Sequence, residues 1–550
     1  MVRLENIFNS RRGQILRENL TAYLFLAPAG LIIFVFGIFP VAFAFFVSLH
    51  EWGRFPEEYT GLKQYQDALG DFAYVLFFWI AAGLIAFGLF SLWKLFQQNR
   101  GSPVNFLMLA PAAAITAAIL TFVNWLFIVL IFIMNVPVRL RGQTTSQGLF
   151  VEEFLRSFTF PEPLAAADIL WPVVIGAALV TMVFYALVRT EDKSGVLLRA
   201  TTAFLALGAG VLLMSLTVNE IQMAVDAARE KGESLPIWSQ VILISTGAAL
   251  FAAAYPVWKR AHRAEDNHRF IGLLLTAVLL IIGAYLLIAQ LPSALAEADK
   301  DILRGFNVTV MYTIGTVPLQ LTIGLGLALL LFQNIRGKSF FRVVYFLPYI
   351  TPFVATSAVF SLIFSHRPDS PINQLINSVG IPDQTWLQQP RGIFELLFGS
   401  GIPSWLVGPG LALIVIILYN TWVYAGYSTV IFLAGLGNIS RETYEAARID
   451  GANQWQTFRF ITLPLLSPTT FFLVLIATIG TFQAFTQIFL LRKPGAYEAV
   501  DTINIYILEE IRASRPDYAY GSAMAFVLFG VILILTILQN RYAQRRVFYG

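Results

Sequence analysis

The sequence YEAARIDGANQWQTFRFITLP, residues 444–464, is a polar segment rich in small residues that lies between two long apolar runs. A loop that only joins two membrane helices needs a few residues. This one carries helix-forming Glu-Ala-Ala at 445–447 and then a breaker at Gly451. A second helix-like stretch follows and is expected to stop at Pro464. The pattern predicts two short helices that lie outside a bilayer and are presented to a partner.

The composition indicates a membrane protein. Hydrophobic residues make up 57% of the chain and charged residues 13%, against a charged share of about 25% in ordinary globular domains. Spanning hydrocarbon takes about 20 mostly apolar residues in a helix, which satisfies its own backbone polar groups. We therefore predict an all-α polytopic membrane protein with about twelve transmembrane helices. The predicted spans are residues 22–49, 73–93, 105–135, 169–188, 201–218, 237–257, 270–290, 308–332, 343–365, 408–434, 466–490 and 520–540.

Basic residues predict the orientation, because short loops rich in Lys and Arg stay in the cytoplasm. With the N-terminus inside, the cytoplasmic segments hold 22 of the 37 Lys and Arg residues but only 9 of the 33 Asp and Glu residues. The first apolar run continues to about Leu49, beyond the ~7–15 residues of a cleavable signal core, and is interpreted as a retained helix. We expect a multi-pass protein of the inner (plasma) membrane with both termini cytoplasmic.

The sequence lacks the residues that an enzyme or an ion-coupled pump would use. Cysteine is absent, which excludes a thiolate metal site, and the four histidines have no metal-ligand spacing. No ionisable residue falls near the middle of a predicted span, where proton and ion pathways place one. Gly-Lys-Ser at 337–339 matches only the tail of a phosphate-binding loop, because Phe332 replaces its first glycine. We predict no catalytic residue, no metal and no cofactor of its own.

Residues 444–464 resemble the signature loop of the permease subunits of binding-protein-dependent ABC importers. The family pattern is Glu-Ala-Ala, three residues, Gly, nine residues, and then Ile-x-Leu-Pro. The chain meets this pattern without a gap at Glu445, Ala446, Ala447, Gly451, Ile461, Leu463 and Pro464. The resemblance implies that these residues couple the chain to a separate ATPase subunit.

Four other segments are similar to the carbohydrate branch of this family and occur in the family's order. They are residues 61–65, 306–309, 337–348 and 520–525. The resemblance covers about residues 20–72 and 300–550 and is closest to the larger subunit of the maltose-type permeases. It implies a six-helix ABC importer permease core, made from the first span and the last five, with a six-helix insert.

Three segments follow as predicted domains. Residues 1–72 are an N-terminal segment with the first core helix, residues 73–300 are inserted transmembrane helices, and residues 301–550 are the permease core with a cytoplasmic coupling loop at 437–464. An insert that begins and ends outside needs an even number of spans, which six satisfies. Leu-Arg-Lys-Pro-Gly at 491–495 departs from the family, which often has Gly-Gly-Pro there. The resemblance assigns no role to the insert.

Two core spans carry polar and aromatic residues that suit a sugar. Amides and hydroxyls can hydrogen-bond sugar hydroxyls, and aromatic faces can pack against sugar C–H groups. The resemblance places a sugar site on the same two helices. The alternative is interhelical hydrogen bonding, worth about 0.6–2 kcal/mol per contact. The candidate substrate-binding residues are Asn420, Tyr424 and Tyr427, which share one helix face, and Thr481, Gln483 and Gln487.

We interpret the chain as the transmembrane permease subunit of an ATP-driven ABC importer that translocates a sugar or oligosaccharide, maltose-like, delivered by an external binding protein. The implied partners are two ATPase subunits that use ATP-Mg, a second permease subunit, an external solute-binding protein, the sugar and membrane lipid, with no nucleic acid. ATP hydrolysis is expected in the ATPase subunits, so the chain itself is not an enzyme.

Two other functions stay open at this point. A twelve-helix secondary carrier for a small polar solute fits the span count, although residues 1–275 and 276–550 show no convincing repeat of the kind such carriers contain. A membrane-embedded enzyme for lipid-linked substrates would need a polar catalytic cluster, and none is visible. Uptake that persists without an ATPase partner would favour the carrier, and turnover by the isolated chain would favour the enzyme.

Overall fold

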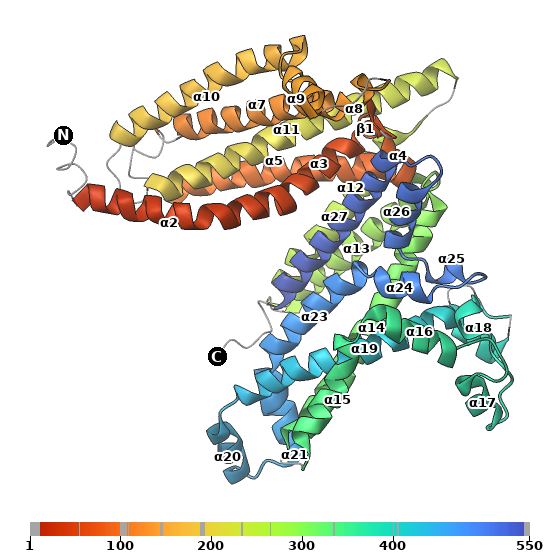
Figure 1. Cartoon of the computed structure of the whole chain (residues 1–550). Helices are drawn as coiled ribbons and strands as arrows, with labels where there is room; N and C mark the ends of the chain where they lie inside the picture. Colours follow the sequence, from red (N-terminus) through yellow and green to blue (C-terminus); the bar gives the residue numbers. More distant parts are fainter. Residues whose placement is uncertain are drawn as a thin grey trace. The chain divides into compact units, whose positions relative to one another are not determined.

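The computed structural model describes residues 11–53, 55–98, 107, 109–142, 147–187, 193–232, 235–263, 266–333, 336–399, 401–403 and 406–543. Within these ranges the regular structure is helical apart from one two-stranded hairpin (Figure 1). Ten of the described helices are long and apolar enough to cross a membrane, and two bent pairs of helices raise the number to as many as twelve. The predicted all-α, multi-pass fold is confirmed, while the orientation of the termini stays a prediction.

The chain forms two compact units, residues 1–298 with 515–523 and residues 299–514 with 524–550. The first unit contains α2 (Arg11–Ile33), the π-helix η1 (Phe34–Ile38), α3 (Phe39–Ser48), β1 (His50–Trp52), β2 (Pro56–Tyr59), α4 (Lys63–Leu69), α5 (Phe72–Gln98), α7 (Leu109–Met134), α8 (Val136–Arg139), α9 (Gln147–Arg156), α10 (Pro161–Leu187), α11 (Lys193–Glu230), α12 (Ile237–Ala261) and α13 (Asp266–Ala294).

The second unit begins with α14 (Lys300–Phe332), and both groupings share the last helix, α27 (Tyr518–Ala543). The two units are defined by how residues pack and differ from the predicted segments 1–72, 73–300 and 301–550. The domain boundaries therefore stay a prediction. The other elements are α15 (Lys338–Ile350), α16 (Phe353–Ile363), α17 (Pro371–Asn377), the 3-10 helix η2 (Trp386–Gln388), α18 (Ile393–Phe398), α19 (Leu411–Gly437), α20 (Arg441–Ile449), α21 (Gln454–Thr457), the π-helix η4 (Phe458–Thr462), α22 (Leu463–Leu465), α23 (Ser467–Phe482), α24 (Thr486–Leu491), α25 (Tyr497–Val500) and α26 (Ile503–Arg512).

In the first unit, α5 and α11 pack antiparallel through glycines. A Cβ atom at Gly88 of α5 would lie 2.8 Å from the carbonyl oxygen of Ala203, and one at Gly210 of α11 would lie 3.0 Å from that of Ala81. Small residues let membrane helices approach closely enough for backbone contact. The antiparallel direction agrees with the predicted alternation, in which these helices are the second and fifth spans.

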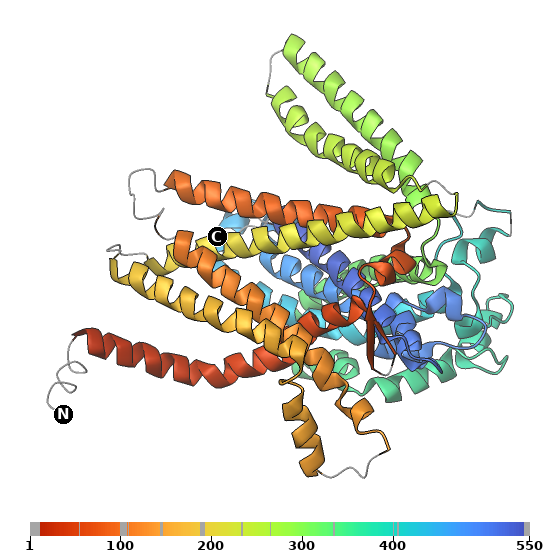
Figure 2. The same cartoon turned by 90° about the horizontal axis from the view of Figure 1, so that it is seen from above.

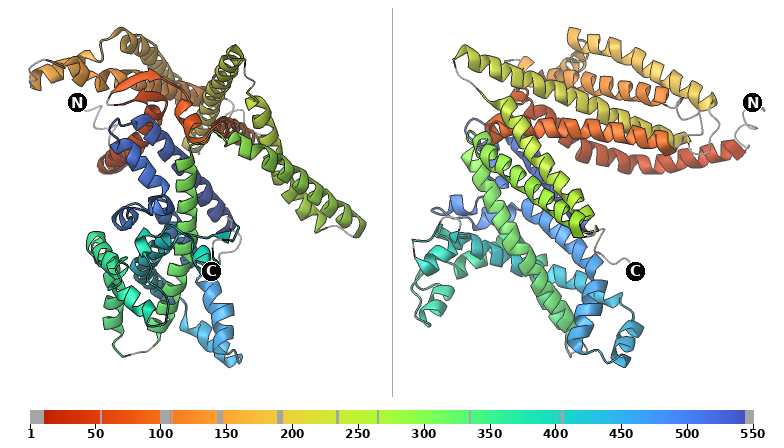
Figure 3. Two further views of the ribbon diagram at one scale, coloured as in Figure 1. Left: turned by 90° about the vertical axis from the view of Figure 1, so that its right-hand side faces the viewer. Right: turned by 180° about the vertical axis from the view of Figure 1, so that it is seen from behind.

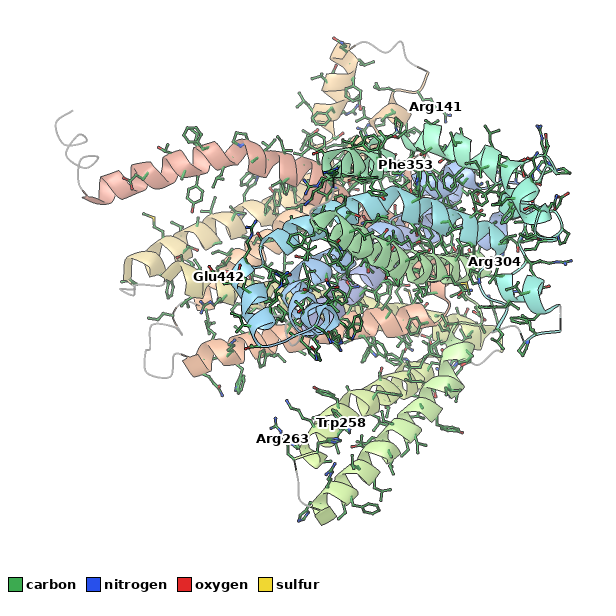
Figure 4. All side chains as sticks on the ribbon, turned by 90° about the horizontal axis from the view of Figure 1, so that it is seen from below. Arg141, Trp258, Arg263, Arg304, Phe353 and Glu442 are labelled. Carbon is green, nitrogen blue, oxygen red and sulfur yellow. The ribbon has the colours of Figure 1, made fainter. Side chains whose placement is uncertain are left out.

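The helices α12 and α13 form a second antiparallel pair (Figure 2). Gly247 and Gly283 face each other across it, since a Cβ atom at either would lie about 3 Å from the other's carbonyl oxygen. Trp258 and Arg263 mark the end at which the two helices connect (Figure 4). The pair is held mainly by apolar packing and close backbone approach.

The segment at 61–65, one of the family-like motifs, forms a tight turn before α4. Gly61 has a φ of +57°, which favours glycine. The turn buries Leu62 and Tyr65, and the Tyr65 hydroxyl lies 2.7 Å from the hydroxyl of Ser48 at the end of α3. The motif therefore ties α4 to the end of the first span.

In the second unit, α19 is the central helix and is buried along most of its length. It runs beside α14 in the same direction, as the eighth and tenth predicted spans should (Figure 3). A Cβ atom at Gly324 of α14 would lie 2.7 Å from the Cβ of Ser428, and one at Gly315 would lie 2.6 Å from Ile417. The two backbones are therefore as close as their side chains permit.

Two predicted spans are broken in the structure. The span at 343–365 divides into α15 and α16, which are bent by 95° at Thr351 and Pro352. Proline forces the preceding residue into extended backbone, which ends α15. The span at 466–490 ends early at Phe482. The Asn504 side chain donates to the Phe482 carbonyl oxygen at 2.8 Å and so satisfies this helix-end carbonyl, which has no partner within the helix.

The stop predicted at Pro464 falls one residue later. The helical run from Gln454 to Leu465 continues through Pro464 and then bends by 62° into α23. Proline cannot donate a backbone hydrogen bond, and the run adjusts through the π-helix η4, in which the Leu463 N–H donates to the Phe458 carbonyl.

Exchanging a glycine at the close contact of α19 should destabilise the second unit. In a Gly426→Ala variant the new methyl group would collide with the Tyr345 carbonyl of α15. We expect the free energy of unfolding to fall by about 1–3 kcal/mol, the usual range for overpacking. The control is Gly437→Ala in the same helix, where no described atom lies within 4 Å of the new carbon. Equal melting temperatures in detergent for both variants would contradict this interpretation.

Candidate functional site

A cavity of about 150 Å³ lies inside the second unit. Residues of α14, α15, α19, α23 and α24 surround it, so the helix break after Phe482 helps to shape one wall. The structure brings together five of the six predicted substrate-binding residues here. The lining comprises Gln320, Tyr349, Asn420, Tyr424, Tyr427, Ser428, Leu473, Ile476, Ala477, Gly480, Thr481 and Gln487.

Gln483 is the predicted site residue that the structure does not place in this lining. It caps the C-terminus of α23 and is exposed. The prediction assumed one continuous helix across 466–490, whereas the chain leaves the helix after Phe482 and re-enters it at Thr486. Residues two positions apart in a helix do not share a face, so Gln483 points away from the face that carries Thr481. The break after Phe482 places Gln487 in a separate helix, α24, from which it joins Thr481 in the lining.

Asn420 and Gln487 form the polar wall of the cavity. The Gln487 amide nitrogen donates to the Asn420 Oδ1 and to the Tyr312 hydroxyl, each at 3.3 Å. All three side chains are buried. Because the Asn420 carbonyl accepts from Gln487, its amide group is held in one orientation and its nitrogen stays available as a donor.

Three tyrosines form the aromatic wall. The Tyr349 ring stacks on that of Tyr427 with centroids 5.0 Å apart, and it meets the Tyr424 ring edge-on at 5.7 Å. Tyr349 comes from α15 and the other two from α19, so the wall forms only when these helices pack together. Rings in this arrangement present apolar faces with hydroxyls at their edges.

Sequence reasoning missed Gln320 and Tyr349. Gln320 is 4% exposed, and its Oε1 has no hydrogen-bond partner among the described residues. Gln320 is the single amide in the predicted span 308–332, and this was the available signal, because an unsatisfied polar group in a membrane interior is costly. Tyr349 gave a weaker signal, since tyrosine is common in membrane proteins.

The signature loop begins with the short, well-capped helix α20. The Ser440 hydroxyl accepts from the backbone N–H of Thr443 at 3.3 Å, and Glu442 lies in the first turn, where it favours the helix dipole (Figure 4). At the other end Ala452 N–H donates to the Ala447 carbonyl at 2.9 Å, and Gly451 N–H donates to the Arg448 carbonyl at 3.1 Å. This pair of bonds is a Schellman motif.

Gly451 makes this motif possible. Its φ of +78° lies in the left-handed region, which residues with a Cβ atom adopt at a cost. The Tyr444 hydroxyl lies 3.3 Å from that of Thr462, which links α20 to the next helical run. The loop is therefore a compact two-helix element with a defined shape.

The predicted coupling residues differ in exposure. Glu445, Ala446 and Gly451 are exposed, whereas Ala447 lies on the buried face of α20. Ile461, Leu463 and Pro464 are half-buried. Three large apolar side chains that the prediction did not include are also exposed on the loop. They are Ile449 (86% exposed), Trp455 (67%) and Phe460 (70%).

Arg492, in the segment that departs from the family pattern, organises a cluster of charges. Its guanidinium contacts Asp501 at 3.1 Å and Glu509 at 2.7 Å and lies 4.5 Å from the centre of the Tyr497 ring. Burial raises the pKa of Asp501 to about 7; Arg492 opposes this rise in pKa, and Glu509 adds to it. At the start of α14, Arg304 forms ion pairs with Asp301 at 3.0 Å and with Glu498 at 3.3 Å. Arg304 is labelled in Figure 4.

The family described as "Binding-protein-dependent transport system inner membrane component" matches residues 320–548, which include the cavity and the signature loop. Over 251 residues the chain is 32% identical to the lactose transport system permease protein LacF of Rhizobium radiobacter, covering 45% of this chain and 78% of that protein. It is 27% identical over 239 residues to the trehalose/maltose transport system permease protein MalF of Thermococcus litoralis, covering 44% of this chain and 74% of that protein.

A crystal structure of a bacterial alginate ABC transporter, in complex with an alginate pentasaccharide-bound periplasmic protein, contains a similar chain. The similarity covers 52% of this chain and 97% of that chain, at 22% identity and a TM-score of 0.39. A TM-score this low does not support a helix-by-helix comparison.

The buried carboxyl of Asp501 should make stability depend on pH. Because folding raises its pKa from 3.8 to about 7, the folded state binds this proton more tightly than the unfolded state does. The free energy of unfolding should therefore fall as the pH rises through this interval. We expect the loss of melting temperature between about pH 5 and about pH 8 to shrink in an Asp501→Asn variant. Exposed Asp369→Asn is the control, and equal slopes for wild type and Asp501→Asn would refute the assignment.

Proposed function

The chain belongs to the family of inner membrane components of binding-protein-dependent transport systems, and we propose that it is the permease subunit of an ATP-driven ABC importer for a sugar or oligosaccharide, maltose-like. Members of this family are transporter subunits rather than enzymes. The observation that carries the sugar proposal is the cavity, in which buried amides face a wall of tyrosine rings. The names of the lactose and trehalose/maltose relatives support the same substrate class.

Each wall has a separate role in the proposed site. The Asn420 amide, oriented by Gln487, and the unpartnered Gln320 Oε1 would hydrogen-bond sugar hydroxyls. The rings of Tyr349, Tyr424 and Tyr427 would pack against the C–H faces. Thr481 adds a hydroxyl, although it already donates within its own helix to Ala477 or Thr478. An uncharged solute is favoured because no ionisable carboxylate or amine lines the described cavity.

The cavity is small for a ligand site, as expected if the importer is in a state that holds no sugar. Its volume of about 150 Å³ is below the ~300–1,000 Å³ of typical ligand pockets. We propose that it widens when the importer changes state and that an external binding protein supplies the sugar. Sugar can shift the equilibrium between two states only by binding one more tightly than the other. The amide and tyrosine walls come from different helices, so a shift of α15 against α19 would change both.

The signature loop is the proposed contact with the energy source. Two ATPase subunits that use ATP-Mg would act on the importer, one through this loop and one through a second permease subunit. Exposed Glu445 and Ala446, with the apolar side chains of Ile449 and Trp455, would face the ATPase. The capped ends of α20 keep the element rigid, so it can transmit movement of its partner to α19 and α23. Half-buried Ile461, Leu463 and Pro464 would join it to the membrane part.

A direct test of function is uptake by proteoliposomes that contain the chain with its partner subunits. Uptake of a radiolabelled malto-oligosaccharide should require ATP inside and the binding protein outside. Transport driven by a proton or sodium gradient without ATP would contradict the proposal and favour the secondary carrier.

The unpartnered amide of Gln320 provides a test of the sugar site. A Gln320→Leu variant loses no hydrogen bond of its Oε1 in the folded protein, so its melting temperature should stay near that of the wild type. Loss of one hydrogen bond to the sugar, about 1 kcal/mol, should raise the KM for uptake about five-fold. Thr316→Val is the control, because the Thr316 hydroxyl is likewise buried without a partner in the described structure but lies outside the cavity lining. Equal KM values for the two variants would remove Gln320 from the site.

Gly451 provides a test of coupling. Proline cannot adopt its φ of +78° or donate its N–H to Arg448, so a Gly451→Pro variant should lose the Schellman motif. We expect sugar-stimulated ATP hydrolysis by the assembled importer to be abolished while membrane insertion is retained. The control is Gly232→Pro, since Gly232 has the same φ of +78° and its N–H donates to Arg229 at 3.0 Å, but it lies in the insert. Unchanged coupling in Gly451→Pro would exclude the loop as the contact.

A further inference from the structure

A second polar cavity lies in the first unit, among the helices that the family resemblance does not cover. It has a volume of about 390 Å³ and is lined by residues from the C-terminal part of α5 and the N-terminal part of α11. These two helices are labelled in Figure 1. Its lining residues are Phe87, Ser91, Lys94 and Leu95 of α5 with Arg199 and Thr202 of α11. The proposed transport mechanism uses none of these residues.

Helix geometry and packing bring the two cations together. The α5 residues recur at i, i+4, i+7 and i+8, which places them on one face of the helix. Leu95 and Ala200 are buried in the same apolar cluster. Lys94 directly precedes Leu95, and Arg199 directly precedes Ala200. Because α5 and α11 pack antiparallel, both cations lie at the same end of the helix pair.

The described lining of the cavity carries two positive charges and no negative one. Lys94 and Arg199 are both exposed, and neither forms an ion pair with any residue that the structure describes. Among the described residues the lining contains no carboxylate, while Ser91 offers a hydroxyl between the cations and the apolar part of the cavity. Two cations and a hydroxyl on one concave surface attract the negative charge of a phosphate group and can donate hydrogen bonds to its oxygens.

The position along the helices favours a lipid over a soluble anion. Lys94 and Arg199 fall just beyond the predicted spans 73–93 and 201–218, at the membrane boundary that the basic loops assign to the cytoplasm. Phe87 lies two turns further into the span on the same face and is 58% exposed. Trp93, 54% exposed, marks the interfacial level. The site therefore has a cationic end at the headgroup level and an apolar end at the acyl-chain level.

We propose that this cavity binds an anionic phospholipid of the cytoplasmic leaflet, with its phosphodiester between Lys94 and Arg199 and an acyl chain along Phe87. Basic pockets between transmembrane helices are a known form of anionic headgroup site. A bound lipid would link the C-terminal end of α5 to the N-terminal end of α11, where the charged residues Lys94 and Arg199 lie. It would give the inserted helices a lipid-binding function beyond packing.

The experiment measures lipid binding to the purified full-length chain in detergent, after delipidation. Phosphatidylglycerol or phosphatidylcholine is titrated in, and bound lipid is counted by native mass spectrometry. One basic side chain near an anionic surface contributes about five-fold to affinity, so a variant with both Lys94→Gln and Arg199→Gln should bind phosphatidylglycerol about 30-fold more weakly. The matched control carries Lys259→Gln and Arg260→Gln, two exposed cations in the last turn of α12.

The proposal stands if phosphatidylglycerol binds more tightly than phosphatidylcholine, the double variant loses that preference and the control variant keeps it. It is overturned if the double variant binds phosphatidylglycerol as the wild type does, or if both lipids bind equally. Displacement of the lipid by inorganic phosphate at millimolar concentration would also overturn it, because the site would then recognise a soluble anion. Only variants that elute from a size-exclusion column like the wild type are compared. If the double variant does not, the single variants Lys94→Gln and Arg199→Gln are used in its place.

Discussion

The close backbone packing of α19 against α14 and α15 is the contact on which the second unit depends. Gly324 and Gly426 lie where the helices touch, and a methyl group at either position would collide with the neighbouring chain. In a membrane, helices gain no hydrophobic free energy by leaving lipid, so van der Waals packing and hydrogen bonds must hold them together. Close packing also draws the polar side chains of α14 and α19 to one level and leaves the small cavity between them.

In the membrane interior each buried polar group has a large effect on stability, because no water is present to hydrogen-bond it. Gln487 satisfies Asn420 and Tyr312, and Asn504 satisfies the carbonyl that ends α23, so these groups stabilise the fold. The Gln320 Oε1 is left without a partner in the described structure. A binding site needs such a group, because polar atoms that are already hydrogen-bonded within the protein cannot bond a solute without breaking those bonds. The proposed sugar site would therefore retain some unfavourable free energy when empty.

The two proposals place different chemistry in different parts of the chain. The proposed sugar site is uncharged and enclosed by the described helices of the second unit, whereas the proposed lipid site in the first unit is cationic and open at a helix end. A membrane protein can separate them in this way because a cation is tolerated at the interface but is costly in the interior. The signature loop belongs to neither site, and its capped helix suits a mechanical role.

The sequence by itself determined the features that depend on local pattern. Hydropathy runs located the spans, and the spacing from Glu445 to Pro464 identified the loop, because such features are read from neighbouring residues along one helix or turn. The face shared by Asn420, Tyr424 and Tyr427 follows from helical periodicity alone. Only the tertiary structure decided that Gln320 and Tyr349 join them and that Gln483 does not. That outcome depends on which helices touch and on contacts such as the bond by which Asn504 caps the end of α23 from 22 residues away. Such distant contacts leave no periodic trace in the sequence.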